Sequence, residues 1–369
     1  MDVDMMGTWS PADLIPPWRA LLRSLCLMGC LLCPHVTSWA DDDLLPERVC
    51  EPDRCAGEDS VWLISTRHLG CAQPGHFTPE DLRVWQSQVG GRWRRSTVSE
   101  LTSQVDADQD PNSVTTLYVD GNRVDAADAI RRGMRIYCEL RQRTPAHRRF
   151  CHVIWSWPSD KVAAPVKDTR IKASRTISEG YYLGSFLAEM PSTKRISLIG
   201  YSFGPRIITK SLHLMGGGAA DGMALPQEKL VASPPRYRVV AFAAALDNDW
   251  LVPGRRHGQA ISVIDRMLLI YNSRDAALKR YGRIYGRPGV EALGYTGLVH
   301  AVCLGDAASR IDQMDATCVV GKQHNWDLYV ADQNLMDSMS RYAVWESETV
   351  AELDETRDQQ ARITSHQAR

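Results

Sequence analysis

Short apolar runs of strand length alternate with longer stretches of helical spacing along most of the chain. The runs are rich in Val, Ile, Leu and aromatic residues, and Gly, Pro, Asn or Asp often follow them, which is the pattern of β-strands. The predicted strands are 61–66, 82–87, 92–97, 114–119, 150–157, 195–199, 238–246, 267–271 and 316–320.

Apolar residues recur at every third or fourth position between several of these runs, which predicts amphipathic helices. An Asp-rich stretch at 103–112 is predicted to be a loop. Strands that alternate with helices favour an α/β fold with a mostly parallel, doubly wound sheet, here with short antiparallel strands at its N-terminal side. Such a sheet binds ligands at the carboxyl ends of its strands. Two helical faces are marked by Ala127, Ile130, Met134 and Cys138 and by Ile177, Tyr181, Gly184 and Ala188. Helices are also predicted over 205–215 and 332–350.

The first forty residues differ from the rest. Arg19 and Arg23 precede a short apolar run at 25–32, and Ser38-Trp39-Ala40 follows, a pattern typical of a cleaved secretory signal peptide. An uncleaved anchor, a misplaced start and a lipoprotein site remain alternatives. We therefore predict a signal peptide at 1–40, a polar lead-in with the first strands at 41–112, the core at 113–350 and a polar tail at 351–369.

Composition narrows the possible partners. A formal net charge of -1, with no basic stripe, argues against a nucleic-acid binder. No segment after the signal is long and apolar enough to cross a membrane. Seven cysteines lie beyond the signal, and export would allow disulfides between them, for example Cys303 with Cys318, or Cys71 with Cys50 or Cys55. No paired Cys or His spacing indicates a metal site.

Gly200-Tyr201-Ser202-Phe203-Gly204 is the strongest chemical signal. The motif G-x-S-x-G is weak by itself, but this copy follows a predicted strand and precedes a predicted helix, as a nucleophile elbow requires. The glycines let the neighbouring backbone pass a sharply turned serine. A glycine-flanked turn with a capping serine is the structural alternative.

A serine hydroxyl needs a base, and in this type of fold an acid and then a histidine follow the serine along the chain. Asp275 follows the strand at 267–271, and His324 follows the one predicted at 316–320. Asp275 could instead cap a helix, and His324 could be a surface residue. Asp247 and Asp249 are the alternative acids.

The second chemical requirement is a pair of backbone N–H groups for a developing oxyanion. Phe203 provides one at the start of the helix, and Gly121 or Asn122 provides the other after the strand at 114–119. The alternative for Asp120-Gly121 is a simple turn.

From about Val114 to about Tyr329 the chain resembles the α/β-hydrolase superfamily, in particular a bacterial branch of it. Besides the elbow, the resemblance rests on 119–122, on Trp155-Ser156-Trp157-Pro158-Ser159 and on 271–278. It implies Ser202 as nucleophile, Asp275 as acid and His324 as base. The family has His-Gly where this chain has Asp120-Gly121. A negative charge there would oppose catalysis unless it is paired, and Arg123 is the expected partner.

The leading hypothesis is thus an exported serine hydrolase, periplasmic or secreted, that cleaves an ester, thioester or amide of a small or lipid-like substrate without a cofactor. A non-catalytic binding protein on the same scaffold is the alternative. A lipase whose lid lies within 216–235 is a third hypothesis. Neither the substrate nor the oligomeric state follows from the sequence.

Overall fold

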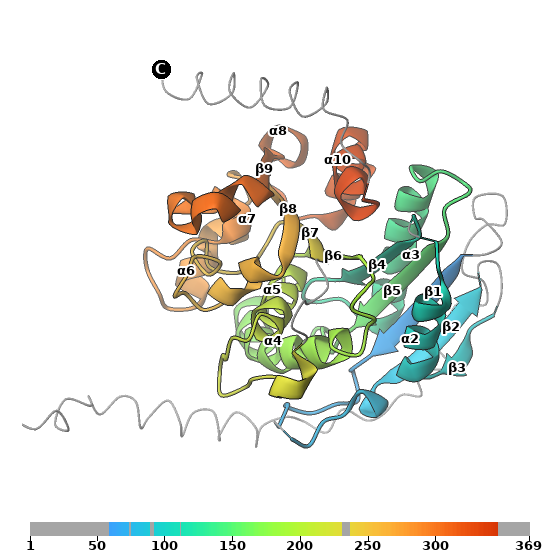
Figure 1. The fold of residues 1–369 in the computed structure, drawn as a ribbon. Helices are drawn as coiled ribbons and strands as arrows, with labels where there is room; N and C mark the ends of the chain where they lie inside the picture. Colours follow the sequence, from blue (N-terminus) through green and yellow to red (C-terminus); the bar gives the residue numbers. More distant parts are fainter. Residues whose placement is uncertain (1–58, 74, 89–91, 111, 231–236, 346–369) are drawn as a thin grey trace, which may run out of the picture. The chain divides into compact units, whose positions relative to one another are not determined.

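Nine strands form one sheet in the residues that the computed structural model describes, 59–73, 75–88, 92–110, 112–230 and 237–345 (Figure 1). Their order is β3-β2-β1-β5-β4-β6-β7-β8-β9. β2 runs antiparallel to β1 and β3, and all other neighbours are parallel. The strands are β1 Ser60–Ser65, β2 Arg83–Gln88, β3 Arg94–Ser96, β4 Val114–Val119, β5 Phe150–Ser156, β6 Ile196–Tyr201, β7 Tyr237–Phe242, β8 Ile264–Tyr271 and β9 Ile311–Asp315.

Helices cover both faces of this sheet. α3 and α10 contact each other and central strands on one face, and α4 and α5 pair on the other (Figure 1). Ile130 and Met134 of α3 are buried as their spacing predicts, whereas Ala127 is exposed. The α-helices are α2 Val98–Ala107, α3 Ala126–Gln142, α4 Pro165–Leu187, α5 Gly204–Met215, α6 Tyr281–Ile284, α7 Leu293–Thr296, α8 Thr317–Val320, α9 Trp326–Ala331 and α10 Gln333–Ala343.

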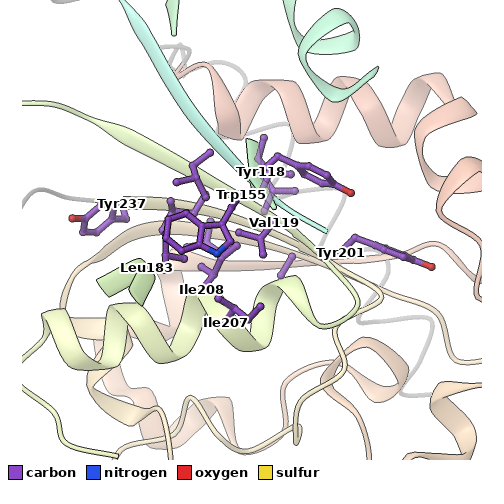
Figure 2. Packing of buried hydrophobic residues seen from close by; sticks show 14 of the residues in the cluster. Tyr118, Val119, Trp155, Leu183, Tyr201, Ile207, Ile208 and Tyr237 are labelled. Atoms are coloured by element: carbon purple, nitrogen blue, oxygen red, sulfur yellow. The ribbon is translucent and has the colours of Figure 1, made fainter. Parts of the chain in front are cut away.

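The core lies on both sides of the central strands. Figure 2 shows Trp155 and Val119 of neighbouring strands packed with Ile207 and Ile208 of α5 and Leu183 of α4. Every residue of β4 and β6 is buried, which explains why apolar and polar side chains do not strictly alternate along these strands. The predicted fold class, a mostly parallel α/β sheet with short antiparallel N-terminal strands, is confirmed.

The last strand was predicted in the wrong place. β9 is Ile311–Asp315, a polar edge strand with no buried residue, and the apolar segment 316–320 forms a turn and the short helix α8. The Asp315 side chain accepts from the Thr317 N–H at 2.8 Å, and Gly321 ends the helix at φ 64°. This local capping outweighs the β-propensity of Val319 and Val320.

Two further predictions need correction. Half of the predicted loop at 103–112 belongs to α2, whose Thr97 cap accepts from Glu100 N–H and whose Leu101 and Val105 are buried. The strand predicted over 238–246 ends at Phe242, because Ala243 takes a φ of 50° and the chain turns there. The residues that follow the turn are buried even though they are not part of the strand. The final helix covers 333–343, within the predicted span.

Some predictions fall on residues that the structure does not describe, and others, on cysteines and membrane spans, can be compared with it. The proposed signal peptide, the polar tail, Cys50 and Cys55 lie outside the described residues. Cys303 and Cys318 carry free thiols, so the disulfide suggested between them is absent. No helix in the described ranges has the length and apolar character to cross a membrane.

His152 is a buried histidine at the centre of the sheet. Its Nδ1 lies 2.7 Å from the Thr116 hydroxyl on the neighbouring strand β4. Burial lowers the pKa of His152 from 6.5 to about 3. Below pH 6.5 the unfolded chain therefore binds a proton that the folded protein rejects, and stability falls as the pH falls.

We predict that His152→Asn removes this dependence, because the amide can still bond to Thr116 but does not titrate. Relative to the variant, the wild type loses roughly 1 kcal/mol of unfolding free energy per pH unit below the ordinary histidine pKa. Chemical denaturation of both proteins at neutral and mildly acidic pH measures the difference. Equal losses in the two proteins would contradict the assignment.

Candidate active site

Ser202 sits at a sharp corner where β6 ends and α5 begins. Its φ is 54°, in the left-handed region that a non-glycine residue rarely adopts. The corner is possible only because the flanking residues lack side chains: a Cβ on Gly200 would lie 2.6 Å from Pro205 N, and one on Gly204 would lie 2.1 Å from Val119 O. Strand β7 holds the corner from the other side, because Ser202 N–H donates to Phe242 O at 3.1 Å and Ser202 O accepts from Ala245 N–H at 2.8 Å.

Three side chains that are distant in the sequence meet at this corner. The Ser202 Oγ lies 3.0 Å from Nε2 of His324, and the His324 Nδ1 lies 2.6 Å from Oδ2 of Asp275. An ionised carboxylate only accepts, so Nδ1 carries the proton and Nε2 is free to accept from the serine hydroxyl. The arrangement is therefore a hydroxyl, a base and an acid in one hydrogen-bonded chain.

The loops that carry Asp275 and His324 are bonded to each other. Asn272, fully buried, donates its Nδ2 hydrogen to Gly321 O at 2.8 Å, and Ala276 N–H donates to Lys322 O at 3.1 Å. These bonds explain why His324 reaches the site even though the strand before it was predicted at the wrong residues. The loop that follows β9 and α8 is fixed directly to the loop that follows β8.

The Asp275 carboxylate both caps the turn that follows it and faces His324. Oδ1 accepts from the N–H groups of Ala277 and Leu278, each at 2.9 Å, which caps the turn that follows, and Oδ2 faces His324. The side chain is fully buried. Hydrogen bonds to one oxygen fix the direction of the other, so the cap also orients the carboxylate toward the imidazole.

Tyr201 has a role that the sequence did not indicate. Its ring stacks on the His324 imidazole, with centroids 5.3 Å apart and planes inclined by 28°, and its hydroxyl donates to the His324 backbone oxygen at 3.2 Å. It thereby contacts both the ring and the main chain of His324. The tyrosine was singled out only as an elbow position, because nothing in the sequence relates it to a residue 123 positions away.

The loop after β4 lies against the corner, as the strand register requires. Val119 pairs with Gly200, and a Cβ on Gly121 would lie 2.9 Å from the Ser202 Cβ. The N–H of Gly121 is engaged by its neighbour's carboxylate, Asp120 Oδ1, at 2.6 Å. Among the described residues, the backbone N–H groups of Phe203 and Asn122 have no acceptor. Phe203 and Asn122, rather than Gly121, are therefore the candidate oxyanion donors.

Asp120 is paired, but not with Arg123 as expected. Its Oδ1 accepts from Arg132 Nη1 of α3 at 3.1 Å, whereas Arg123 faces Asp168 at 3.3 Å. The reason is geometric: Arg123 turns away at a φ of 66°, while α3 folds back over the strand end and brings Arg132 to the carboxylate. Burial raises the pKa of Asp120, and the Arg132 charge opposes that shift.

The two alternative acids are bonded elsewhere, and Asp249 faces Arg255 at 3.2 Å. Asp247 accepts from Arg287 and Tyr281. His257 is buried, with Nδ1 2.8 Å from the Thr209 hydroxyl. Across the described ranges, no three His, Cys, Asp or Glu side chains gather as a metal-ligand set.

The sheet order, the helices on both faces and the strand-to-helix corner make this an α/β-hydrolase-like fold. No family model matches the chain, and a search of curated proteins finds no match. Among solved structures, a match is the crystal structure of a C6-C4 SN3 inhibited esterase B from Lactobacillus rhamnosis. It has 11% sequence identity and a TM-score of 0.35, over 94% of this chain and 99% of the esterase chain. Similarity at this level says nothing of the chemistry of this chain.

We predict that Gly204→Ala destabilises the protein by about 2 kcal/mol or more, because the new methyl group overlaps the Val119 carbonyl. Gly70→Ala is the matched control, since nothing lies within 4 Å of a Cβ there. Thermal or denaturant unfolding of both variants checks this. A Gly204→Ala protein as stable as Gly70→Ala would show that the corner is looser than described.

Arg132→Met should cost about 3 kcal/mol of unfolding free energy, because it leaves the Asp120 carboxylate buried without its counter-charge. Adding Asp120→Asn should restore part of that loss. The exposed neighbour Arg131, paired with Asp128, is the control, and Arg131→Met should cost about 0.5 kcal/mol or less. Equal costs for the two arginines, measured by denaturant unfolding, would exclude a structural role for the buried pair.

Proposed function

We propose that the protein is a serine hydrolase that cleaves an ester, thioester or amide through Ser202, His324 and Asp275. The observation that carries the proposal is the hydrogen-bonded chain from Ser202 Oγ to His324 Nε2, at 3.0 Å, and from His324 Nδ1 to Asp275, at 2.6 Å. Both distances lie within the range needed for proton transfer in the ground state.

In the proposed reaction, Ser202 Oγ attacks the substrate carbonyl while His324 Nε2 takes the hydroxyl proton. Asp275 stabilises the resulting imidazolium and holds the ring in the required tautomer. His324 then returns the proton to the leaving group, and water repeats the sequence to release the acid. The fully buried Asp275 cannot be reached by solvent, so its interaction with the imidazolium is little screened.

The negative oxygen of the tetrahedral intermediate needs donors that are already in place. Phe203 N–H lies at the start of α5, next to the nucleophile, and Asn122 N–H lies in the loop packed against it. We propose these two groups as the oxyanion donors. The Asp120 carboxylate accepts from the Gly121 N–H, so that N–H is not a proposed oxyanion donor. Arg132 compensates the negative charge of Asp120, which reduces its repulsion of the oxyanion.

The non-catalytic alternative requires Ser202 and His324 to face apart or the serine to be inaccessible. Their side chains face each other at 3.0 Å, which favours the enzyme. Ser202 is 7% exposed and the His324 side chain is 22% exposed, so neither is sealed from solvent. Export, a cleaved leader at 1–40 and a small or lipid-like substrate remain part of the proposal on the grounds given by the sequence.

A fluorophosphonate probe tests the proposal directly, because it reacts only with an activated serine. Ser202→Ala should abolish labelling, and Asp275→Asn should slow hydrolysis of an activated ester by about 10³-fold or more. Ser273→Ala, an exposed serine in the Asp275 loop, is the matched control and should label like the wild type. Labelling that persists in Ser202→Ala would refute the assignment.

A further inference from the structure

Arg206 is a buried cation beside the candidate site. It belongs to the first turn of α5, four positions after Ser202, and only 9% of the residue is exposed. Aromatic rings surround the guanidinium: its carbon lies 4.7 Å from the ring centroid of Trp250, 5.7 Å from that of Tyr285 and 5.9 Å from that of Phe203. The environment is apolar, and such contacts compensate a desolvated charge only in part.

Arg206 has no anionic partner among the described residues. Its Nη1 donates to the Tyr281 hydroxyl at 3.4 Å, and that hydroxyl donates to Asp247 at 2.7 Å. Asp247 is itself held by both terminal nitrogens of Arg287, at 2.7 and 2.8 Å. Asp247 is thus paired directly with Arg287, whereas Arg206 reaches it only through the Tyr281 hydroxyl. This leaves the Arg206 charge uncompensated.

Part of this guanidinium is open to solvent. Nε and Nη2 of Arg206 make no hydrogen bond with described residues, and neither is among the atoms that are fully buried without a partner. These two nitrogens therefore reach solvent although the residue around them is almost wholly buried. A guanidinium edge with two free donors in an apolar surround is suited to binding a carboxylate or another flat anion through two parallel hydrogen bonds.

The position of this group connects it to the proposed chemistry. Arg206, Asp247 and Tyr281 come from the segments that follow β6, β7 and β8, the same sheet edge that carries Ser202 and Asp275. Phe203 links the two directly, because its ring contacts the Arg206 guanidinium and its backbone N–H is a proposed oxyanion donor.

We propose that Arg206 is a specificity residue that binds a carboxylate carried by the substrate, so that the enzyme prefers esters with a second, anionic end. This inference rests on the proposed function. One uncompensated positive charge matches one carboxylate, whereas a dianionic phosphate would bring an excess negative charge into an aromatic surround. The carboxylate would replace the missing counter-ion, and Ser202 would attack the ester carbonyl at the other end of the same molecule.

The test compares para-nitrophenyl monoesters of dicarboxylic acids, from adipate to sebacate, with their methyl esters, which lack only the charge. The readout is the ratio of kcat/KM for the acid to that for the methyl ester, which does not depend on the fraction of active protein. The wild type should prefer the acid at one or more chain lengths. A ratio of one or less at every length would overturn the proposal.

Substitution then assigns the preference to Arg206. Arg206→Met should lower the ratio about tenfold or more, equivalent to about 1.4 kcal/mol, and Arg206→Lys should give an intermediate value because it keeps the charge without the planar fork. Arg255→Met is the matched control, because Arg255 is exposed and pairs with Asp249, and because its substitution changes the net charge by the same amount. It should leave the ratio unchanged. A ratio that survives Arg206→Met would also overturn the proposal.

A binding measurement separates this inference from the proposed function. Ser202→Ala, which cannot turn over, is titrated calorimetrically with monomethyl adipate and with dimethyl adipate. Tighter binding of the monoacid that is lost in Ser202→Ala/Arg206→Met supports the anion site, even if Ser202 is not labelled by fluorophosphonate. Equal binding of the two compounds counts against the site, even if Ser202 is labelled.

Discussion

The whole site depends on one backbone constraint, the tight turn that takes the chain from β6 into α5. A serine with a φ of 54° is strained, and the strain is tolerated because Gly200 and Gly204 leave room for Pro205 and for the Val119 carbonyl. The hydrogen bonds of Ser202 to Phe242 and Ala245 then fix the turn to the end of β7. The same turn directs the serine hydroxyl away from the sheet and places the first N–H groups of α5 beside it, so one conformation provides both the proposed nucleophile and a proposed oxyanion donor.

Charge placement around that turn follows from burial. Asp275, Asp120 and Asp247 are all almost fully buried, and each is bonded to a different partner: an imidazole, Arg132 and Arg287. A buried carboxylate is stable only with such compensation. Asp120 lies beside the proposed oxyanion site, where an unpaired negative charge would oppose the proposed reaction, and it is paired to Arg132 and to the Gly121 N–H. Arg206, by contrast, is a buried cation that bonds to no carboxylate among the described residues, and in the inference above the substrate supplies the missing anion.

The sequence predicted those features that depend on local pattern. Apolar runs indicated the central strands, and the positions of Ser202 and Asp275 after two of these strands indicated residues that the structure brings together. His324 joins them although the strand predicted before it, 316–320, is a short helix and its cap. Features that depend on contacts between distant segments were missed. β9 is polar because it is an edge strand, so it lacks the apolar signal. The Asp120–Arg132 pair requires α3 to fold back over the strand end, and the stacking of Tyr201 on His324 joins residues that are 123 positions apart. Helix α2 could have been recognised from Thr97 and Glu100, with Leu101 and Val105 at helical spacing.

The most direct measurement is a crystal structure of the protein after reaction with a small alkyl fluorophosphonate, whose adduct mimics the tetrahedral intermediate. The account predicts phosphorus bonded to Ser202 Oγ, with the phosphoryl oxygen within hydrogen-bonding distance of the Phe203 and Asn122 backbone nitrogens and with His324 Nε2 beside the leaving-group position. An adduct on another residue, or a phosphoryl oxygen that faces neither nitrogen, would contradict it.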